Sequence, residues 1–211
     1  PQDNCYGMML LSRLPLIEPK IRFIVEDTVP YIEVGLELQS GARVHLRGVH
    51  PRPPQPVKDQ HTTERDAEIV IVGREIDERK ESVPTIVAGD FNDVAWSRTT
   101  KLFMRLSSLL DPRMGRGFYN TFHARYPFFR FPLDHVFHSS EFKIQDLRVL
   151  PYVGSDHFPV LAELSYESSD AHEQPEPDAG LEEEQEADDK VEKAVAEDGN
   201  DLDSPDDAKP E

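Results

Sequence analysis

The succession of short strand patterns and two longer helix patterns is the feature that most constrains the fold of this chain. Three strand patterns come first, at Ile21–Val25, Tyr31–Leu38 and Ala42–Val49, where apolar and polar residues alternate and β-branched residues are frequent. Gln39-Ser40-Gly41 separates the last two and predicts a hairpin turn. Strands followed by helices that alternate with further strands predict an α/β protein in which helices cover a sheet.

Two segments have the spacing and start signals of helices. Thr62 or Thr63 can cap a helix that runs to Lys80, and Ser97 can cap a second helix that runs to Leu110. The remaining strand patterns are these: Pro84–Ala88, Leu133–Phe137, Ile144–Leu150 and Phe158–Leu164. The first of them is short and continuously apolar, which is typical of a strand buried on both faces.

The net charge of −18 is concentrated at one end of the chain. Residues 167–211 contain 19 acidic and 3 basic residues, and we predict that they form a disordered acidic tail in which Leu181–Val195 can form a transient helix. Residues 1–166 are nearly neutral and form the predicted folded domain. Near-neutrality argues against broad, non-specific binding of long duplex DNA. The single cysteine excludes an internal disulfide, and no run of 18 apolar residues predicts a membrane span.

Acidic, amide and histidine side chains gather at the ends of the predicted strands. They are His50, Asp90, Asn92, Asp134, Asp156 and His157. Each alone is a weak signal, since an isolated Asp more often forms a turn and an isolated His more often has a structural role. Together they offer oxygen ligands for a hard divalent cation and donors for a phosphoryl group. A histidine held by an aspartate is a tuned acid or base. The set therefore predicts phosphodiester hydrolysis.

Three motifs in this order resemble the endonuclease/exonuclease/phosphatase superfamily, whose members are DNase I-like. They are Gly89-Asp90-Phe91-Asn92, Leu133-Asp134-His135-Val136-Phe137 and Gly154-Ser155-Asp156-His157-Phe158-Pro159. The segment Tyr6–Leu16 is similar to the family's central strand, and the resemblance covers about residues 4–165. It implies a four-layer α/β sandwich of two mixed sheets flanked by helices, incomplete at the N-terminus.

The resemblance also implies roles for individual residues. The catalytic residues would be His50, Asp90, Asn92, Asp134 and His157, and the ligands of Mg²⁺ or Mn²⁺ would be Asp90, Asn92 and Asp156. Asp134 would fix the tautomer of His157, which would act as general base or phosphate donor. His50 would lie across the scissile phosphate as donor or general acid. Water would attack phosphorus in line with the leaving group.

One departure from the family pattern keeps other hypotheses open. The family's main metal ligand is a Glu that belongs upstream of Ser12-Arg13, so this chain is expected to be the C-terminal two-thirds of a catalytic domain. A non-catalytic remnant or binding module is therefore an alternative. Details such as His50-Pro51-Arg52-Pro53-Pro54 are similar to a bacterial branch whose members often carry membrane helices upstream. That similarity predicts a bacterial protein, anchored through helices absent from this chain. Its localisation is otherwise unknown.

The substrate is left open by the sequence. Residues 98–130 hold seven basic and seven aromatic residues, which suit phosphate recognition and either base stacking or contact with lipid. The ordinary alternative is that Phe103, Phe122 and Phe129 belong to the hydrophobic core and that the arginines only lie on the surface. The candidate substrates are nucleic acid, a phospholipid headgroup (as in sphingomyelinases) and a small phosphoester. No partner protein is identifiable, and a monomer is expected. His61, His123 and His138 are predicted to be non-catalytic, and His135 should face away from Asp134.

Overall fold

The computed structural model describes residues 4, 6–54, 60–78, 83–167, 174 and 176–201. The elements in chain order are β1 (Leu16–Phe23), β2 (Pro30–Glu37), β3 (Arg43–Val49), α1 (Gln60–Glu78), β4 (Thr85–Asp90), α2 (Arg98–Ser107), β5 (Asp134–His138), β6 (Phe142–Val149), β7 (Val160–Tyr166) and α3 (Leu181–Asp201). Each strand and helix predicted from the periodicity of residues 21–164 is present, with ends that differ by a few residues.

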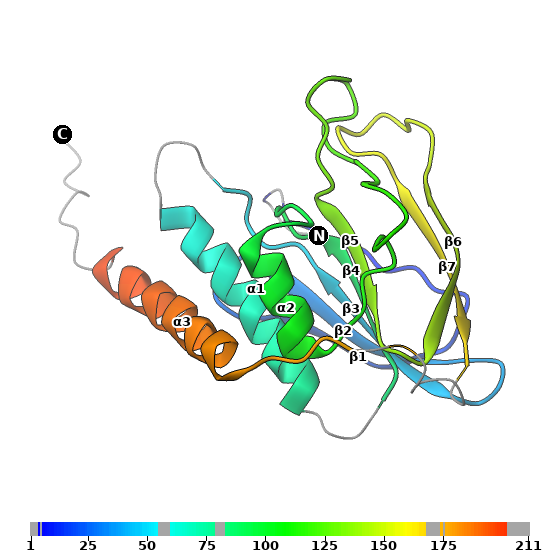
Figure 1. Cartoon of the computed structure of the whole chain (residues 1–211), viewed down its shortest axis with the longest axis horizontal. Helices are drawn as coiled ribbons and strands as arrows, with labels where there is room; N and C mark the ends of the chain where they lie inside the picture. The colour runs from blue at the N-terminus through cyan, green and yellow to red at the C-terminus, as the bar shows by residue number, and fades with distance from the viewer. Residues whose placement is uncertain are drawn as a thin grey trace, which may run out of the picture.

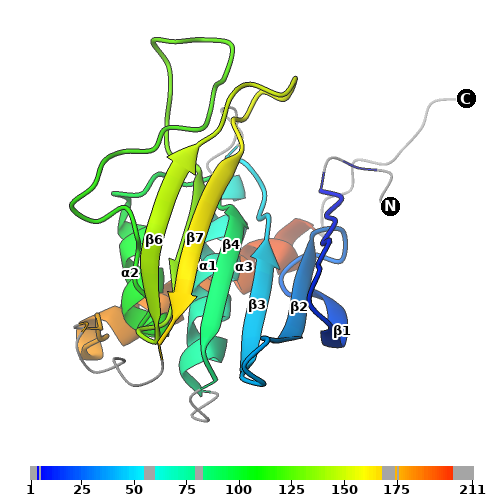
Figure 2. The same ribbon diagram turned by 90° about the vertical axis from the view of Figure 1, so that its right-hand side faces the viewer.

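The first five strands form one sheet in the order β1-β2-β3-β4-β5 (Figure 2). Neighbouring strands are antiparallel except for β3 and β4, which are parallel. A parallel pair needs a crossover connection, and α1 lies in the segment that joins these two strands. The sheet is therefore mixed, and its parallel pair brings the carboxyl ends of β3 and β4 to the same edge.

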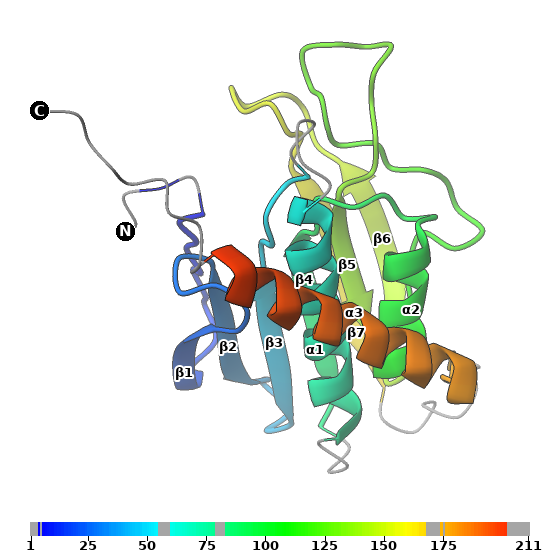
Figure 3. The same ribbon diagram turned by 90° about the vertical axis from the view of Figure 1, so that its left-hand side faces the viewer.

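Helices α1 and α2 cover one face of this sheet (Figure 3). The core between them contains apolar residues of both layers, among them Ile69 of α1, Phe103 of α2 and Val87 of β4. The helix start predicted at Ser97 is confirmed, because its side chain accepts a hydrogen bond of 2.9 Å from the amide of Thr100. The helix ends at Ser107 rather than at the predicted residue 110, since the next residue adopts a left-handed conformation.

A second sheet lies on the other side of the main sheet (Figure 1). It consists of β6 and β7, an antiparallel pair, so the prediction that both sheets are mixed is wrong for the described residues. The predicted class of fold is confirmed: the molecule is an α/β protein with two sheets and helices. Within the described part of the chain, the layers are the helices, the five-stranded sheet and the two-stranded sheet.

Helix α3 corrects the prediction of a disordered tail over residues 181–201. It packs across α1 and α2 (Figure 3), and its Ala187 is buried with Val70, Leu102 and Leu106. Its acidic residues pair with arginines of the two helices, as in Arg98–Glu186 at 2.6 Å. Arginines of α1 and α2 therefore offset the repulsion between the acidic side chains of this segment. A count of charge within the segment alone does not include them. The other predicted tail residues lie largely outside the described part.

The N-terminal segment also differs from the prediction. Residues 7–13 form no strand, and β1 begins only at Leu16, where it pairs with β2. Within the described part of the chain, residues 7–13 enter no ladder. None of the helices in the described ranges is both long and apolar enough to cross a membrane.

Candidate active site

The ends of three neighbouring strands bring the predicted site residues together. In the parallel pair, Val49 is the register partner of Gly89, so His50 follows β3 beside the end of β4. In the antiparallel pair of β4 and β5, Asp90 and Asp134 are direct register partners. Because paired residues lie about 5 Å apart across a ladder, the two carboxylates must share one edge of the sheet.

Gly89 permits the close approach of β3 and β4 at this edge. A Cβ atom at position 89 would lie 1.9 Å from the carbonyl oxygen of Val49, and the φ angle of the residue is +157°. Both observations exclude a side chain at this position without movement of the strands. The glycine that precedes Asp90 therefore allows His50 and Asp90 to lie on adjacent strand ends.

His157 reaches the same point from the loop that precedes β7. Its Nδ1 atom donates a hydrogen bond of 2.7 Å to Oδ2 of Asp134. Its Nε2 atom lies 3.6 Å from Oδ2 of Asp90. The ring of Phe122 packs against the imidazole at 4.9 Å, and the two residues also form an isolated β-bridge. The imidazole is thus oriented by a carboxylate on one side and by an aromatic ring on the other.

His50 lies on the opposite side of Asp90. Its Nε2 atom is 3.8 Å from Oδ2 of Asp90, the same oxygen that faces His157. The ring of Tyr6 packs edge-on against His50, with ring centres 5.8 Å apart. One carboxylate oxygen therefore lies between two histidines.

Asn92 is close to these residues but is oriented differently from the prediction. Asn92 does not continue the extended geometry of β4, because it has a left-handed φ angle of 48°. Its amide N–H donates to Oδ1 of Asp90 at 2.8 Å, and its Nδ2 donates to the carbonyl of Pro51 at 2.9 Å. Asn92 thus fixes the carboxylate of Asp90 and ties β4 to the segment that follows β3.

Asp156 precedes His157 in the loop before β7. Its side chain is exposed, and its Oδ1 accepts a hydrogen bond of 3.3 Å from the hydroxyl of Ser155. The group of side chains that could hold a metal ion consists instead of Asp90, Asp134 and His157, whose ligand atoms all lie within 4.8 Å of one another.

Burial is the main reason why Asp90 has an unusual pKa. Desolvation, together with the charge of Asp134, raises the pKa of Asp90 to about 6, although the amide of Asn92 opposes the shift. A carboxylate whose charge is disfavoured in this way gains from a nearby cation. The carboxylate oxygens at this point suit a hard divalent cation such as Mg²⁺ or Mn²⁺, which prefers oxygen ligands. The residues present therefore fit the metal that the resemblance implies.

The two histidines have pKa shifts of opposite direction. Burial alone would lower the pKa of His157, but the hydrogen bond and charge of Asp134, with Asp90 and Asp156, raise it above its usual value. Burial, followed by the charge of His157, lowers the pKa of His50. The site therefore moves the pKa values of the two imidazoles apart, which gives them different proton-transfer properties.

His135 faces away from the cluster, as predicted from strand alternation. Its Nδ1 accepts a hydrogen bond of 2.6 Å from Arg113, and its Nε2 donates one of 2.9 Å to the carbonyl of Asp93. Burial lowers its pKa to about 3, so the ring is neutral and serves as a support beneath the site. The rings of His138 and His123 pack in other places, and the side chain of His61 lies outside the described residues.

Some contacts of the site had no signal in the sequence. Arg65 of α1 donates a hydrogen bond of 2.8 Å to the carbonyl of Asn92. Tyr6 packs on His50 and Phe122 packs on His157. Arg65 is one of several charged residues on its helix, and its contact depends on how α1 lies against the loop after β4.

A cavity of about 330 Å³ lies beside His157, and Gly89, Asp134 and Phe158 are among the residues that line it. Two loops, one before β5 and one between β6 and β7, extend beyond this edge of the sheets (Figure 1). Large apolar side chains are exposed on them: Phe118, Tyr126, Phe128, Phe129, Tyr152 and Val153. We call the five aromatic residues among them the aromatic rim. The alternative that Phe103, Phe122 and Phe129 are core residues holds for Phe103, which is buried, but not for Phe129, which is 70% exposed.

The comparisons with known proteins agree with this fold. A model of the Endonuclease/Exonuclease/phosphatase family matches residues 3–157. The chain therefore belongs to this family. A comparison with curated proteins gives no match.

Several solved structures share the fold. One is an endonuclease/exonuclease/phosphatase family protein from Bacteroides thetaiotaomicron, at 20% identity and a TM-score of 0.58, with 73% of this chain and 66% of that chain covered. A mannosyl-6-phosphatase from B. thetaiotaomicron VPI-5482 has 19% identity, a TM-score of 0.55 and coverages of 72% and 67%. D. rerio TDP2 in complex with a single-strand DNA product has 16% identity, a TM-score of 0.56 and coverages of 72% and 69%. This chain thus spans about two thirds of the length of these structures.

Proposed function

We propose that the protein hydrolyses a phosphoester by in-line attack of water on phosphorus, with Mg²⁺ or Mn²⁺ as cofactor. The observation that carries the proposal is a single carboxylate oxygen, Oδ2 of Asp90, that lies 3.6 Å from His157 and 3.8 Å from His50. Membership of the family supports a hydrolase of this kind. We propose a phosphodiester as the substrate class, acted on as in a nuclease or phosphodiesterase.

Each residue of the cluster has a role in this proposal. His157 is oriented by Asp134, and its raised pKa favours a cationic N–H that donates to a phosphoryl oxygen. His50, whose pKa is lowered by burial, would serve in proton transfer across the scissile phosphate. Asn92 holds Asp90 through its amide and orients the attacking water or the phosphate.

The metal ligands in this proposal are Asp90, Asn92 and Asp156. Asp156 contributes to the pKa shifts of both Asp90 and His157, which supports a charge close to the same point. The cation would stabilise the charge that develops on the phosphoryl oxygens. Asp134 is not a metal ligand in this proposal, because it orients His157 through their 2.7 Å hydrogen bond.

The test is turnover of a chromogenic phosphodiester by the purified protein, in Mg²⁺ and in EDTA. We expect cleavage in Mg²⁺ that is lost in EDTA, and a fall of about a hundredfold or more in kcat for His157→Ala. His45→Ala is the matched control, since His45 is on β3 but at the end opposite His50. Equal turnover by the wild type and His157→Ala would refute the assignment.

The aromatic rim favours a second candidate, a phospholipid-directed hydrolase that acts at a membrane surface. Phe128 is 92% exposed and Phe129 is 70% exposed, on a loop that extends beyond the edge of the sheet that bears the cluster. Exposed aromatic side chains of this kind insert readily between lipid headgroups. Phe128→Ser should then leave turnover of the soluble phosphodiester unchanged and reduce turnover of phospholipid vesicles. Vesicle turnover at background level, with good cleavage of single-stranded DNA, would reject this candidate.

A non-catalytic binding module is the remaining alternative. Close placement of Asp90, Asp134 and both histidines argues against it, because a binding surface needs no oriented imidazole beside paired carboxylates. Calorimetric binding of Mg²⁺ together with turnover would exclude it. The bacterial origin and the upstream membrane helices suggested by the resemblance stay predictions, as does the monomeric state.

A further inference from the structure

Asn92 connects several parts of the candidate active site. Its left-handed φ angle of 48° is unfavourable for a residue with a side chain and needs support from its surroundings. Its amide holds Oδ1 of Asp90, and its side chain holds the carbonyl of Pro51, next to His50. Whatever keeps Asn92 in this conformation therefore also keeps Asp90 and the segment after β3 in place.

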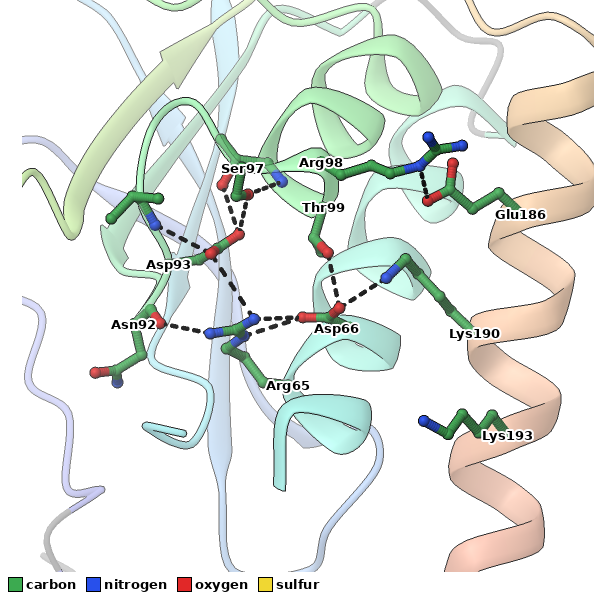
Figure 4. Close-up of polar contacts among 12 residues, drawn as sticks. Arg65, Asp66, Asn92, Asp93, Ser97, Arg98, Thr99, Glu186, Lys190 and Lys193 are labelled. Carbon is green, nitrogen blue, oxygen red and sulfur yellow. Dashed lines mark hydrogen bonds and ion pairs between the residues drawn. The ribbon is translucent and has the colours of Figure 1, made fainter. Parts of the chain in front are cut away.

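Arg65 provides that support from α1. Its Nη1 atom donates to the carbonyl oxygen of Asn92 at 2.8 Å, and the residue is only 9% exposed (Figure 4). Its Nη2 and Nε atoms both donate to Oδ1 of Asp66, at 2.7 and 3.0 Å. Nη2 also lies 3.7 Å from Oδ1 of Asp93. Because a guanidinium group is planar and rigid, fixing one edge on Asp66 sets the direction of the remaining N–H groups.

The other oxygen of Asp66 faces α2 and α3. Its Oδ2 atom accepts hydrogen bonds from the hydroxyl of Thr99 at 2.8 Å and from Nζ of Lys190 at 2.7 Å (Figure 4). Burial would raise the pKa of Asp66, but Lys190 and Arg65 lower it, so the carboxylate stays ionised. The side chains of Lys190 and Asp66 are 22% and 15% exposed, which limits the screening of their attraction by water.

Helix α3 brings Lys190 to this position. Ala187 and Ala194 are buried, and Val191 packs against the same cluster of α1 and α2 residues. Residues three or four apart share one face of a helix, so the face that docks also carries Lys190. The ammonium group of Lys190 therefore reaches Asp66 only when α3 is packed on α1 and α2.

We propose that Lys190 is a positioning residue of the active site. It acts through Asp66 and Arg65 on the carbonyl of Asn92, and so on Asp90. Removal of the ammonium group leaves Asp66 with one cation instead of two, and the guanidinium of Arg65 loses its fixed orientation. The effect of Lys190 on the loop after β4 is inferred from these contacts alone. Its effect on turnover also rests on the proposed function.

The chain offers two matched controls for a Lys190 variant. Lys193 is on the same helix (Figure 4) and has the same charge. Its ion pair, however, is with Glu197 of α3 itself, at 3.8 Å. Arg74 of α1 holds α3 through Asp188 at 2.8 Å and the carbonyl of Glu184 at 2.8 Å. Lys193→Met thus removes an equal charge, and Arg74→Met weakens the docking of α3 at a point that does not lead to Asn92.

The measurement is amide hydrogen exchange at Asn92 and Val94, whose N–H groups bond to the carboxylates of Asp90 and Asp93. We expect exchange at both amides to become about tenfold faster in Lys190→Met. Lys193→Met and Arg74→Met should stay within about twofold of the wild type, and Lys190→Arg should restore slow exchange. Equal acceleration in Lys190→Met and Arg74→Met would overturn the proposal, because it would show a general effect of helix docking. Unchanged exchange in Lys190→Met would overturn it too.

Turnover then separates this proposal from the proposed function. We expect kcat of Lys190→Met to fall by about tenfold with little change in KM, since small displacements of catalytic groups reduce rate strongly. A wild type without turnover, combined with the expected exchange pattern, would reject the proposed function and keep the positioning role of Lys190. Normal kcat in Lys190→Met with altered exchange would reject the link to catalysis.

Discussion

Oδ2 of Asp134 accepts a hydrogen bond of 2.7 Å from Nδ1 of His157, and Asp134 is at the same time the register partner of Asp90. One carboxylate thus orients the imidazole, and the other faces its opposite nitrogen at 3.6 Å. The imidazole is held between two acids that come from adjacent strands. Several expected outcomes follow from this arrangement.

Asp134→Asn should lower kcat by about a hundredfold or more. The variant removes the charge that raises the pKa of His157 and weakens the bond that orients its ring. Steady-state kinetics and an NMR titration of His157 are the measurements, and the pKa of His157 should fall in the variant. Asp146→Asn, at an exposed ion pair on β6, is the control and should match the wild type. A normal kcat in Asp134→Asn would contradict the role given to this pair.

The rate should depend on the protonation of Asp90. Its pKa of about 6 means that the carboxylate is largely protonated below that pH and cannot bind a cation there. We therefore expect kcat/KM to rise as the pH increases through about 6, and the midpoint to move to lower pH as the Mg²⁺ concentration is raised. A pH profile at two Mg²⁺ concentrations tests this. A midpoint near 4 in low Mg²⁺ would show that burial does not control Asp90.

Asp90→Asn should stabilise the metal-free protein at neutral pH. The folded protein keeps a proton on Asp90 up to a pH of about 6, whereas the unfolded chain releases it near 3.8, so the free energy of unfolding falls as the pH rises between these values. The difference of about two pKa units corresponds to about 3 kcal/mol. Urea unfolding in EDTA at pH 4 and pH 8 should show a smaller loss of stability for the variant. An identical loss in variant and wild type would exclude Asp90 as its source.

Asp111→Asn should destabilise the fold. Asp111 and Arg113 have side chains that are 5% and 7% exposed and form three side-chain hydrogen bonds, at 2.7, 2.9 and 3.1 Å. Loss of the carboxylate leaves a buried guanidinium without its counter-charge, at a cost of about 3–5 kcal/mol. Urea unfolding at pH 7 gives the value.

The control for that experiment is the exposed pair of Asp146 and Arg148, with side chains 34% and 60% exposed. Asp146→Asn should change stability by less than about 1 kcal/mol. Similar losses in the free energy of unfolding for the two variants would show that the buried ion pair contributes no more to stability than the exposed one.

The order of the strands along the chain and the main members of the cluster could be predicted from the sequence. Asp90, Asp134 and His157 lie in short motifs, and strand ends that meet at one edge of a sheet bring such motifs together. Strand alternation also gave the correct orientation of His135. These features depend on residues close together in the chain, where periodicity is informative.

Features that depend on distant residues could not be predicted in this way. Lys190 and Asp66 are separated by 124 positions, and Arg65 and Asn92 by 27. The acidic segment forms helix α3 because arginines such as Arg98 compensate its charge, and no local count includes them. The left-handed turn at Asn92 was missed because the motif was treated as continuous with the strand before it.

The absence of a side chain at Gly89 fixes the dimensions of the reaction centre. Two strand ends approach each other there as closely as main-chain atoms allow, so the distance across the floor of the site is a property of the sheet ladder and not of any side chain. Changes in substrate preference would then have to arise in the surrounding loops. An engineer who wishes to redirect this protein should vary the loops and leave the ladder intact.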